Sequence, residues 1–344
     1  MRIRYSTRQS GGRTRRVASG VGIVVALTAV LTTPADAGAR GAAAVTEFPV
    51  TAGASPTFAA AGLGGAVWFT EINGNRIGRM SESGKLTEFP ILTVDGSPLD
   101  ITAGPDGAMW FTEFLGNRIG RVTGTGDITE FPIPTADSDP EGIAVGRDRN
   151  LWFTEGAGNK IGRITPAGRV TEFPMPNPGS TPHSITRGPD GAMWFTEPGT
   201  SRIGRITLAG RISEFTLPAP QRNPHRIVTG PDGNLWFTER AVDRIGRITP
   251  NGQLTDFQLA EGRLPLDITR GADGNLWFTE RAADCIGRIT PIGDIAEFAV
   301  PTPDSDPLGI TTGADRKVWF AEGKGDKIGR LRLPTRTEDG SECP

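Results

Sequence analysis

The sequence predicts an all-β protein, a seven-bladed β-propeller of four-stranded antiparallel blades, from three observations. A Trp-Phe-Thr/Ala-Glu motif occurs seven times, with intervals of 42, 42, 42, 42, 41 and 42 residues. Each repeat holds four short β-type segments separated by turn residues, with no helical periodicity. The chain has 47 glycines and 28 prolines in 344 residues, a composition typical of short strands and tight turns. The motif glutamates are Glu71, Glu113, Glu155, Glu197, Glu239, Glu280 and Glu322.

Residues 140–174 illustrate one repeat. An apolar run at 142–145 is followed by turn residues and then by the aromatic segment 151–155. A glycine-containing turn leads to the segment 160–164, and Pro-Ala-Gly leads to the segment 170–174. Four strands joined by hairpin turns favour a propeller blade over the shorter coils of a parallel β-helix.

The two ends of the repeat array predict how the ring closes. Residues 45–50 have the pattern of a fourth strand but precede the first Trp-Phe motif, and no such strand follows 328–331. We therefore expect the N-terminal strand to complete the last blade, which removes exposed sheet edges. The predicted organisation is a propeller over 45–333, a short linker over 38–44 and a C-terminal tail over 334–344.

Residues 1–37 have the pattern of a secretory signal peptide. Six arginines and one aspartate give the segment a net charge of +5, an uncharged run covers 17–34, and Ala35-Asp36-Ala37 is a small-residue cleavage pattern. The alternative is a membrane anchor, which needs about 20 apolar residues. We expect export, to the medium or the cell envelope, with no membrane span in the mature chain. The Arg15-Arg16 pair leaves Sec and twin-arginine export both open.

Charge and cysteine content bound the partners. The whole chain carries −2, so residues 38–344 carry −7, which argues against a nucleic-acid binder that needs a basic face. We expect a monomer that binds a small ligand. Cys285 and Cys343 are the only cysteines. In an exported chain they pair or remain free thiols, and the sequence leaves both possibilities open.

Both histidines of the chain occupy the same position of the repeat. His183 and His225 each follow the proline that opens an inner strand, on neighbouring blades, and Glu141 holds that position one blade earlier. Antiparallel alternation places this position at the same face as the motif glutamate 14 residues later. Histidine suits general-base work or metal binding, and clustered titratable groups in a concavity favour a site. The alternative is that these polar residues lie at a solvent-exposed rim of the ring and have no catalytic or binding role.

The motif glutamates themselves are interpreted as architectural, because a site needs asymmetry and this feature is sevenfold. Six of the seven are followed five residues later by Arg or Lys, and we expect each pair to form across its hairpin. Glu280 is the exception, because Cys285 takes the place of the base. The Ile-Gly-Arg segments and the Gly-Pro-Asp-Gly turns are interpreted as structural as well.

The pattern Trp-Phe-Thr-Glu, Asn-Arg-Ile-Gly-Arg-Ile, Ile-Thr-Glu-Phe-Pro-Ile-Pro and Pro-His-x-Ile resembles the streptogramin B lyase (virginiamycin B lyase) family over residues 45–333. The resemblance implies a Mg²⁺-dependent carbon–oxygen lyase that confers antibiotic resistance. Such an enzyme opens a cyclic depsipeptide at its ester bond by elimination and consumes no water. In the family a histidine is the base, glutamates hold the metal, and paired Pro-His-x-Ile segments lie on the last two blades.

This chain departs from the family in the position of the histidine pair. Its last two blades carry Leu266 and Leu308 in place of histidine. A closed ring has no privileged first blade, and His183 with His225 restores an adjacent-blade pair two blades earlier.

By this ring equivalence the resemblance implies a role for five residues. His225 is the catalytic base, and His183 and Glu141 bind the substrate. Glu239 and Asn223 hold Mg²⁺. Asn223 stands where the family has Glu, and its amide oxygen is a possible Mg²⁺ ligand that contributes no charge.

Two further functions fit the sequence. One is a non-catalytic propeller that binds a peptide, glycan or protein at its mouth. The other is a lactonase-like metal hydrolase, with ligands such as Asp139, Asn223 and Asp306 drawn from separate blades.

Overall fold

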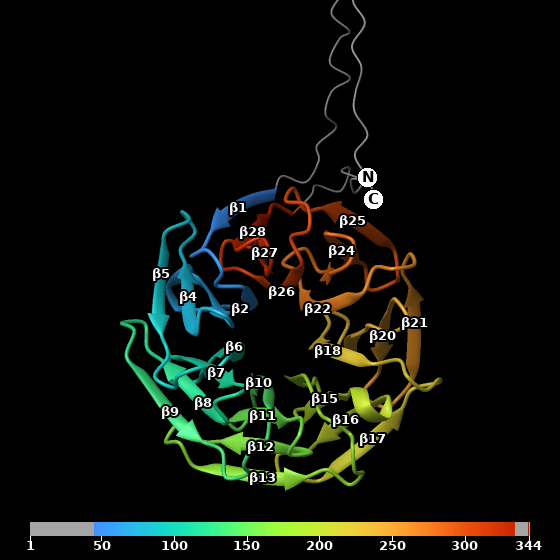
Figure 1. Ribbon diagram of the computed structural model, residues 1–344. Coiled ribbons are helices and arrows are strands. Elements are labelled where there is room, and N and C mark those ends of the chain that lie inside the picture. Colours follow the sequence, from blue (N-terminus) through green and yellow to red (C-terminus); the bar gives the residue numbers. More distant parts are fainter. Residues whose placement is uncertain (1–44, 334–342, 344) are drawn as a thin grey trace, which may run out of the picture. The chain divides into compact units, whose positions relative to one another are not determined.

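The computed structural model describes residues 45–333 and Cys343. The predicted signal peptide, the linker and the remainder of the tail lie outside the described residues. Twenty-eight strands form seven four-stranded antiparallel sheets arranged as a ring (Figure 1), so the predicted all-β propeller is confirmed. Two single 3₁₀ turns, Leu63–Gly65 and Pro198–Thr200, are the helical elements of this part of the chain. No helix within it is long and apolar enough to cross a membrane.

From inner to outer strand, blade one is β2 (Pro56–Ala61), β3 (Val67–Glu71), β4 (Arg76–Met80) and β5 (Leu86–Pro90); blade two is β6 (Pro98–Ala103), β7 (Met109–Glu113), β8 (Arg118–Val122) and β9 (Ile128–Pro132); and blade three is β10 (Pro140–Val145), β11 (Leu151–Glu155), β12 (Lys160–Ile164) and β13 (Val170–Pro174). Blade four is β14 (Ile185–Arg187), β15 (Met193–Glu197), β16 (Arg202–Ile206) and β17 (Ile212–Thr216), and blade five is β18 (Pro224–Thr229), β19 (Leu235–Glu239), β20 (Arg244–Ile248) and β21 (Leu254–Gln258). Blade six is β22 (Pro265–Arg270), β23 (Leu276–Glu280), β24 (Cys285–Ile289) and β25 (Ile295–Ala299), and blade seven is β26 (Pro307–Thr312), β27 (Val318–Glu322), β28 (Lys327–Leu331) and β1 (Val45–Pro49).

The N-terminal strand closes the ring as predicted. β1 pairs antiparallel with β28, and Phe48 lies opposite Ile328. Phe48 stacks on Trp319 with ring centroids 5.6 Å apart, the same contact that the motif tryptophan makes with the outer-strand phenylalanine in the other blades. The closing strand therefore contributes to the last core as well as to the last sheet.

Each blade core is built around its buried tryptophan. Trp152 stacks on Phe173 at 5.5 Å, and its Nε1–H donates to Asp148 Oδ1 of the preceding turn at 3.2 Å. A buried indole needs such an acceptor, which explains the aspartate of the turn. A Cβ on Gly162 would lie 2.1 Å from Cζ of Phe153, so the middle of the Ile-Gly-Arg segment must be glycine.

Six of the seven inner strands begin at the opening proline, as predicted, and the inner strand of the fourth blade begins at Ile185. β10 starts at Pro140, and the ladder to β11 shifts register between Pro140 and Ile143. Thr154 Oγ1 occupies this irregularity, accepting from the Gly142 N–H at 2.8 Å and donating to the carbonyl of His183 in the next blade at 2.6 Å. The motif threonine thus joins neighbouring blades beside the position that the histidines occupy.

Cys285 and Cys343 form a disulfide, with Cα atoms 6.3 Å apart. This decides between the two possibilities that the sequence left open, and it ties the C-terminal tail to β24.

Candidate active site

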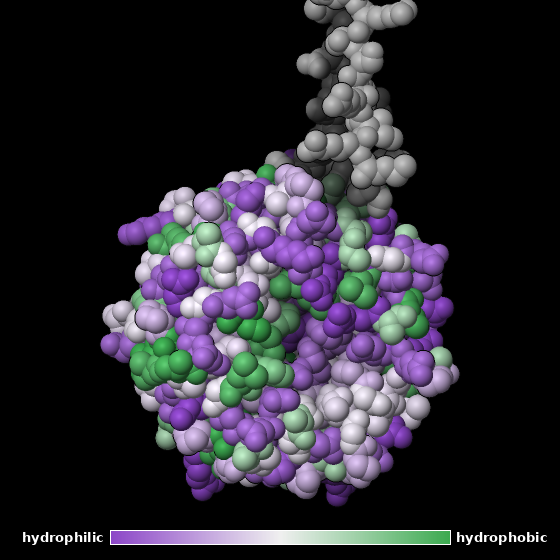
Figure 2. Space-filling view, viewed as in Figure 1, coloured by the Kyte–Doolittle hydropathy of each residue, from purple (hydrophilic) through white to green (hydrophobic). Residues whose placement is uncertain are grey.

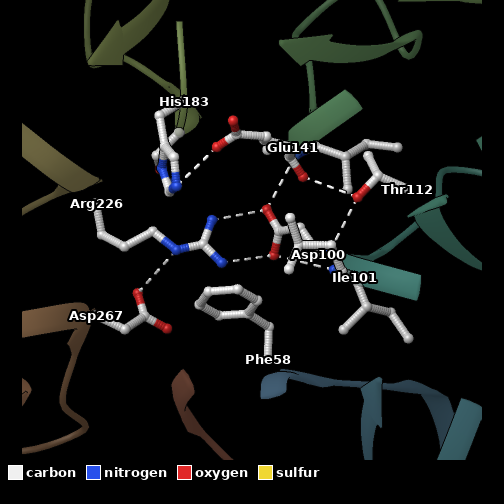
Figure 3. Close-up of polar contacts among 12 residues, drawn as sticks. Phe58, Asp100, Ile101, Thr112, Glu141, His183, Arg226 and Asp267 are labelled. Carbon is white, nitrogen blue, oxygen red and sulfur yellow. Dashed lines mark hydrogen bonds and ion pairs between the residues drawn. The ribbon is translucent and has the colours of Figure 1, made fainter. Parts of the chain in front are cut away.

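Glu141, His183 and His225 come from three consecutive blades at one mouth of the central channel. Glu141 belongs to β10, His183 lies two residues before β14, and His225 belongs to β18. Figure 3 shows the side chains of Glu141 and His183 pointing toward one another. The structure therefore brings together three of the five residues assigned from the sequence.

His183 has a hydrogen-bond acceptor opposite each ring nitrogen. Its Nε2 lies 2.7 Å from Glu141 Oε2, and its Nδ1 lies 3.2 Å from the carbonyl oxygen of His225. Only a doubly protonated imidazolium donates to both. The His183 ring is therefore oriented through both of its nitrogens.

His225 has the surroundings of a neutral base. Its ring lies 3.9 Å from the His183 ring, centroid to centroid, and its Nδ1 is 3.2 Å from the carbonyl oxygen of Leu266. An Nδ1–H that donates to this carbonyl leaves the Nε2 lone pair available. Burial lowers the pKa of His225 well below its usual value, and the charges of His183, Arg226 and Arg240 lower it further.

Arg226 follows His225 on β18, and its side chain extends across the central channel. The Arg226 guanidinium binds both oxygens of Asp100, on β6, at 3.0 and 3.2 Å (Figure 3). Its Nε lies 3.7 Å from Asp267 Oδ1, and its Cζ lies 3.6 Å from the centre of the Phe58 ring. Burial raises the pKa of Asp267 to about 6. Four blades thus meet in one buried cluster beside the histidines.

The two aspartates of this cluster also bind neighbouring blades through the backbone. The Ile143 N–H donates to Asp100 Oδ2 at 3.0 Å, and the Ile310 N–H donates to Asp267 Oδ2 at 2.9 Å. Their positions are therefore set by the ring itself, independently of any ligand.

Glu239 does not face the histidines. Its Cα partner is Pro224, and directly opposed residues point to the same face of a sheet. The next residue, His225, therefore points to the other face. The Glu239 carboxylate is fully buried, and both of its oxygens accept from Arg222 Nη1, at 3.2 and 2.8 Å.

Asn223 has a backbone role. Its φ is 51°, in the left-handed region that favours Asn and Asp over most residues. All seven equivalent positions of the ring have φ between 46° and 56°. The Asn223 carbonyl accepts the backbone N–H of Arg240 at 3.2 Å. The local turn accounts for the asparagine without a metal.

The residues that the resemblance implied for Mg²⁺ do not fit the ion. Arg222 already neutralises Glu239 at its buried oxygens, and Asn223 adds no charge. Among residues 45–333 and Cys343, one trio of possible ligand atoms lies within 4.8 Å, from Glu280 and the two cysteines, whose sulfurs are bonded to each other. Structural contacts, with Arg222 and with the Arg240 N–H, therefore account for Glu239 and Asn223 in the described structure.

The sevenfold glutamates are architectural, but their partners differ from the prediction. All seven are fully buried. Burial raises the pKa of Glu155 to about 8, and Glu172 on the outer strand raises it further. Lys160 pairs with that outer acid, at 3.1 Å. The same pairing of the base with the outer acid recurs for Arg202 with Glu214, Arg244 with Asp256 and Lys327 with Glu47. The ion pair that we expected between the base and the motif glutamate is present for Arg76 and Glu71, where Nε of Arg76 lies 3.2 Å from Oε2 of Glu71.

The blade that lacks the usual base has a substitute. Arg263 Nη2 lies 2.8 Å from Glu297 Oε2, and its Nε lies 3.8 Å from Glu280 Oε2. Arg263 and Arg222 hold the same repeat position, so two blades supply their cation from the loop before the inner strand. This leaves Cys285 free to form the disulfide.

Sequence reasoning missed the cluster around Arg226. The signal was present at the repeat position that directly follows that of the histidines. In the seven blades this position is held by Phe58, Asp100, Gly142, Ser184, Arg226, Asp267 and Gly309. The charged residues at this position are Arg226, Asp100 and Asp267, on three separate blades. The chain order does not show that they meet across the ring axis.

Comparison with known proteins places the chain in a family. The model of the virginiamycin B lyase family matches residues 38–236 and 184–339. A streptogramin B lyase structure is 39% identical, with a TM-score of 0.82, and the match covers 85% of this chain and 98% of that one. Virginiamycin B lyase from Staphylococcus aureus is 41% identical, with a TM-score of 0.81 and coverages of 85% and 99%.

A catalytically inactive histidine-to-alanine variant of the Staphylococcus aureus enzyme, solved with quinupristin, is 40% identical, with a TM-score of 0.81 and coverages of 85% and 99%. A search of curated proteins finds no match. The family model and these structures span the whole propeller and agree with its seven blades. The chain belongs to the virginiamycin B lyase family.

Proposed function

We propose that the protein is a lyase that opens a cyclic depsipeptide of the streptogramin B type at its ester bond by elimination. The observation that carries the proposal is the contact between the His183 and His225 rings at the channel mouth, with Glu141 behind them. A relative at 40% identity has been solved with quinupristin, which supports the substrate class.

His225 acts as the base. It is neutral at pH 7 and keeps the Nε2 lone pair, which takes the proton from the substrate Cα. The electron pair of that C–H bond forms the Cα=Cβ double bond, the Cβ–O bond breaks, and the ester leaves as a carboxylate. No water is consumed, so the ring-opened product has the mass of the substrate.

His183 and Arg240 lie beside the base, and Arg240 supplies the positive charge that this step needs. The His183 ring, held by Glu141, offers a fixed hydrogen-bonding group beside the base. Arg240 Nε is buried with no hydrogen-bond partner among the described residues, and Arg240 lies close enough to lower the pKa of His225. Preorganised cations stabilise the developing negative charge of substrate and leaving group. No step is assigned to a metal ion.

Exposed apolar side chains support an apolar ligand. Leu92 and Val94 lie between β5 and β6, Leu115 lies between β7 and β8, and the three are 65%, 84% and 65% exposed. The Leu115 N–H donates to the Gly96 carbonyl, which joins the two loops at the mouth where the inner strands start. Figure 2 shows hydrophobic surface on this side of the ring, near β5 and β7. A depsipeptide macrocycle with apolar side chains suits such a surface.

The proposal extends to the place of action. The signal-peptide pattern of residues 1–37 supports export to the medium or the envelope. An exported lyase meets the antibiotic before it enters the cell. Fractionation of cells that express the full chain, followed by N-terminal sequencing, tests this part, and an intact N-terminus in the cytoplasm would contradict it.

The activity test uses the mature protein, quinupristin and mass spectrometry. We expect ring-opened product of unchanged mass. The His225→Ala variant should lose at least about 10²-fold in turnover, the usual contribution of a general base. Leu308→Ala, at the same repeat position on another blade, is the matched control and should retain activity.

Other outcomes point to other functions. A product heavier by one water indicates a hydrolase. Saturable binding of quinupristin without turnover indicates a binding propeller. Full activity in His225→Ala would overturn the assignment of the base even if the lyase reaction itself is found.

A further inference from the structure

A cavity lies at the mouth opposite the histidines. Its volume is about 740 Å³, and it is lined by the far ends of the inner strands of five blades and the turns that follow them. His225 and Thr229 mark the two mouths on β18, since Thr229 lines this cavity. Four residues of extended strand separate the mouths by about 13 Å. The Arg226 cluster lies between them.

Three arginines in the cavity wall have no side-chain partner among the described residues. Arg147, Arg187 and Arg270 line the cavity, and all three are exposed. No side-chain hydrogen bond or ion pair involves any of them within the described part of the chain. The cavity therefore presents three uncompensated guanidinium groups.

The carboxylates on this face do not offset that charge. Six of the seven inner hairpins carry an aspartate that accepts the N–H of the blade tryptophan, as in Asp190 with Trp194 at 3.1 Å. Asp190 also binds Arg205 at 2.6 Å, and Asp106 binds Arg121 in the same way. Accordingly, hydrogen bonds from Trp194 and Arg205 lower the pKa of Asp190 despite its partial burial. These acids are directed into the blades, and no acid lines the cavity.

The arginines also break the repeat. The last position of the inner strand is held by Ala61, Ala103, Val145, Arg187, Thr229, Arg270 and Thr312. The backbone contacts of this position do not need a guanidinium, because Thr229 Oγ1 donates to the Arg187 carbonyl and Thr312 Oγ1 donates to the Arg270 carbonyl. A structural role would recur with the repeat. An asymmetric charge in a concavity is instead typical of a ligand site.

We propose that this mouth binds an organic anion that carries two or more carboxylate or phosphate groups. A guanidinium binds either group through paired N–H donors. The volume lies in the range of small-molecule sites, and Val145 and Val228 offer apolar contact to the carbon skeleton. This binding does not depend on the lyase reaction proposed for the other mouth.

Calorimetric titration with citrate and with inorganic pyrophosphate tests the proposal. We expect saturable binding of at least one of them at low salt, weakened as salt rises. Binding of citrate alone indicates carboxylate recognition, and binding of pyrophosphate alone indicates phosphate recognition. The double variant Arg187→Ala/Arg270→Ala should bind about tenfold more weakly or worse, since each lost charged hydrogen bond is worth that much.

Two controls make the result specific. Arg169→Ala removes an exposed arginine in the β12–β13 hairpin, outside the cavity, and should bind as the unchanged protein does. His225→Ala should also bind normally, which separates this site from the lyase. The proposal is overturned if neither anion binds at up to about 10 mM, if the double variant binds unchanged while remaining folded, or if Arg169→Ala loses binding equally.

Discussion

Arg226 and Asp100, 126 positions apart in the chain, form a bidentate ion pair across the middle of the ring. Blade five supplies the guanidinium and blade two supplies the carboxylate. The Phe58 ring covers the guanidinium, and Asp267 flanks it. The pair lies between the mouth that holds the histidines and the mouth that holds Arg147, Arg187 and Arg270, so it separates the two proposed sites.

Replacing Arg226 should destabilise the fold. Arg226→Met leaves two buried carboxylates without their cation, which costs about 3–5 kcal/mol in the free energy of unfolding. Denaturant titration followed by tryptophan fluorescence measures this. Adding Asp100→Asn should restore part of the loss, because it removes one uncompensated charge. A loss below about 1 kcal/mol in the single variant would show that the pair is not energetically important.

The protein should not need Mg²⁺. Arg222 holds the Glu239 oxygens, so we expect calorimetry to show no saturable Mg²⁺ binding up to about 10 mM. A chelator should also leave turnover within about twofold. Arg222→Ser, which gives the residue found at this position in three other blades, frees the carboxylate and is the informative variant. Tight Mg²⁺ binding by the unchanged protein would contradict the structural role of Glu239.

Stability should fall as the pH rises from about 4.5 to about 8. Burial raises the pKa of Glu71, Glu113, Glu155, Glu280 and Glu322 to about 8, from 4.5. The folded chain therefore holds protons that the unfolded chain has released. Their contribution is fully present below pH 4.5 and is lost as the pH rises to about 8.

We expect the melting temperature to drop by more than about 5 °C between pH 5.5 and 8.5. Glu155→Gln, which is neutral at every pH, should reduce this slope. A melting temperature that rises over the same interval would mean that these glutamates are ionised in the folded protein.

The disulfide should stabilise the propeller against unfolding. It closes a loop with a sequence separation of 58, and such a link is worth about 2–4 kcal/mol. Reduction should lower the denaturant midpoint by the corresponding amount. The Cys343→Ser variant should match the reduced protein and show no further response to reductant. Equal midpoints for oxidised and reduced protein would show that the link adds no stability.

The local pattern predicted the strands well. The segments 151–155, 160–164 and 170–174 coincide with β11, β12 and β13, because aromatic and β-branched residues between turn residues leave few alternatives. The proline that opens β10 was predicted as well, but the irregular pairing between Pro140 and Ile143 was not, since no hydrophobic alternation marks it.

The approach of His183 to His225 was likewise predictable, because a closed ring places equal repeat positions side by side. The position of Glu239 was not. Glu239 is paired with Pro224, the residue before His225, so its side chain points to the opposite face of the sheet from the His225 side chain. There Arg222 binds it.

Repetition by itself determined the seven blades, the closing strand and the shared position of the histidines, since each follows from counting along the chain. Only the tertiary structure decided which side chains meet: Arg226 with Asp100 across the ring, Arg222 with Glu239 within one blade, and Cys285 with Cys343 of the C-terminal tail. The physical reason is that a period specifies distance along the ring. Contacts across its axis, and the face to which each side chain points, depend on how the sheets pack.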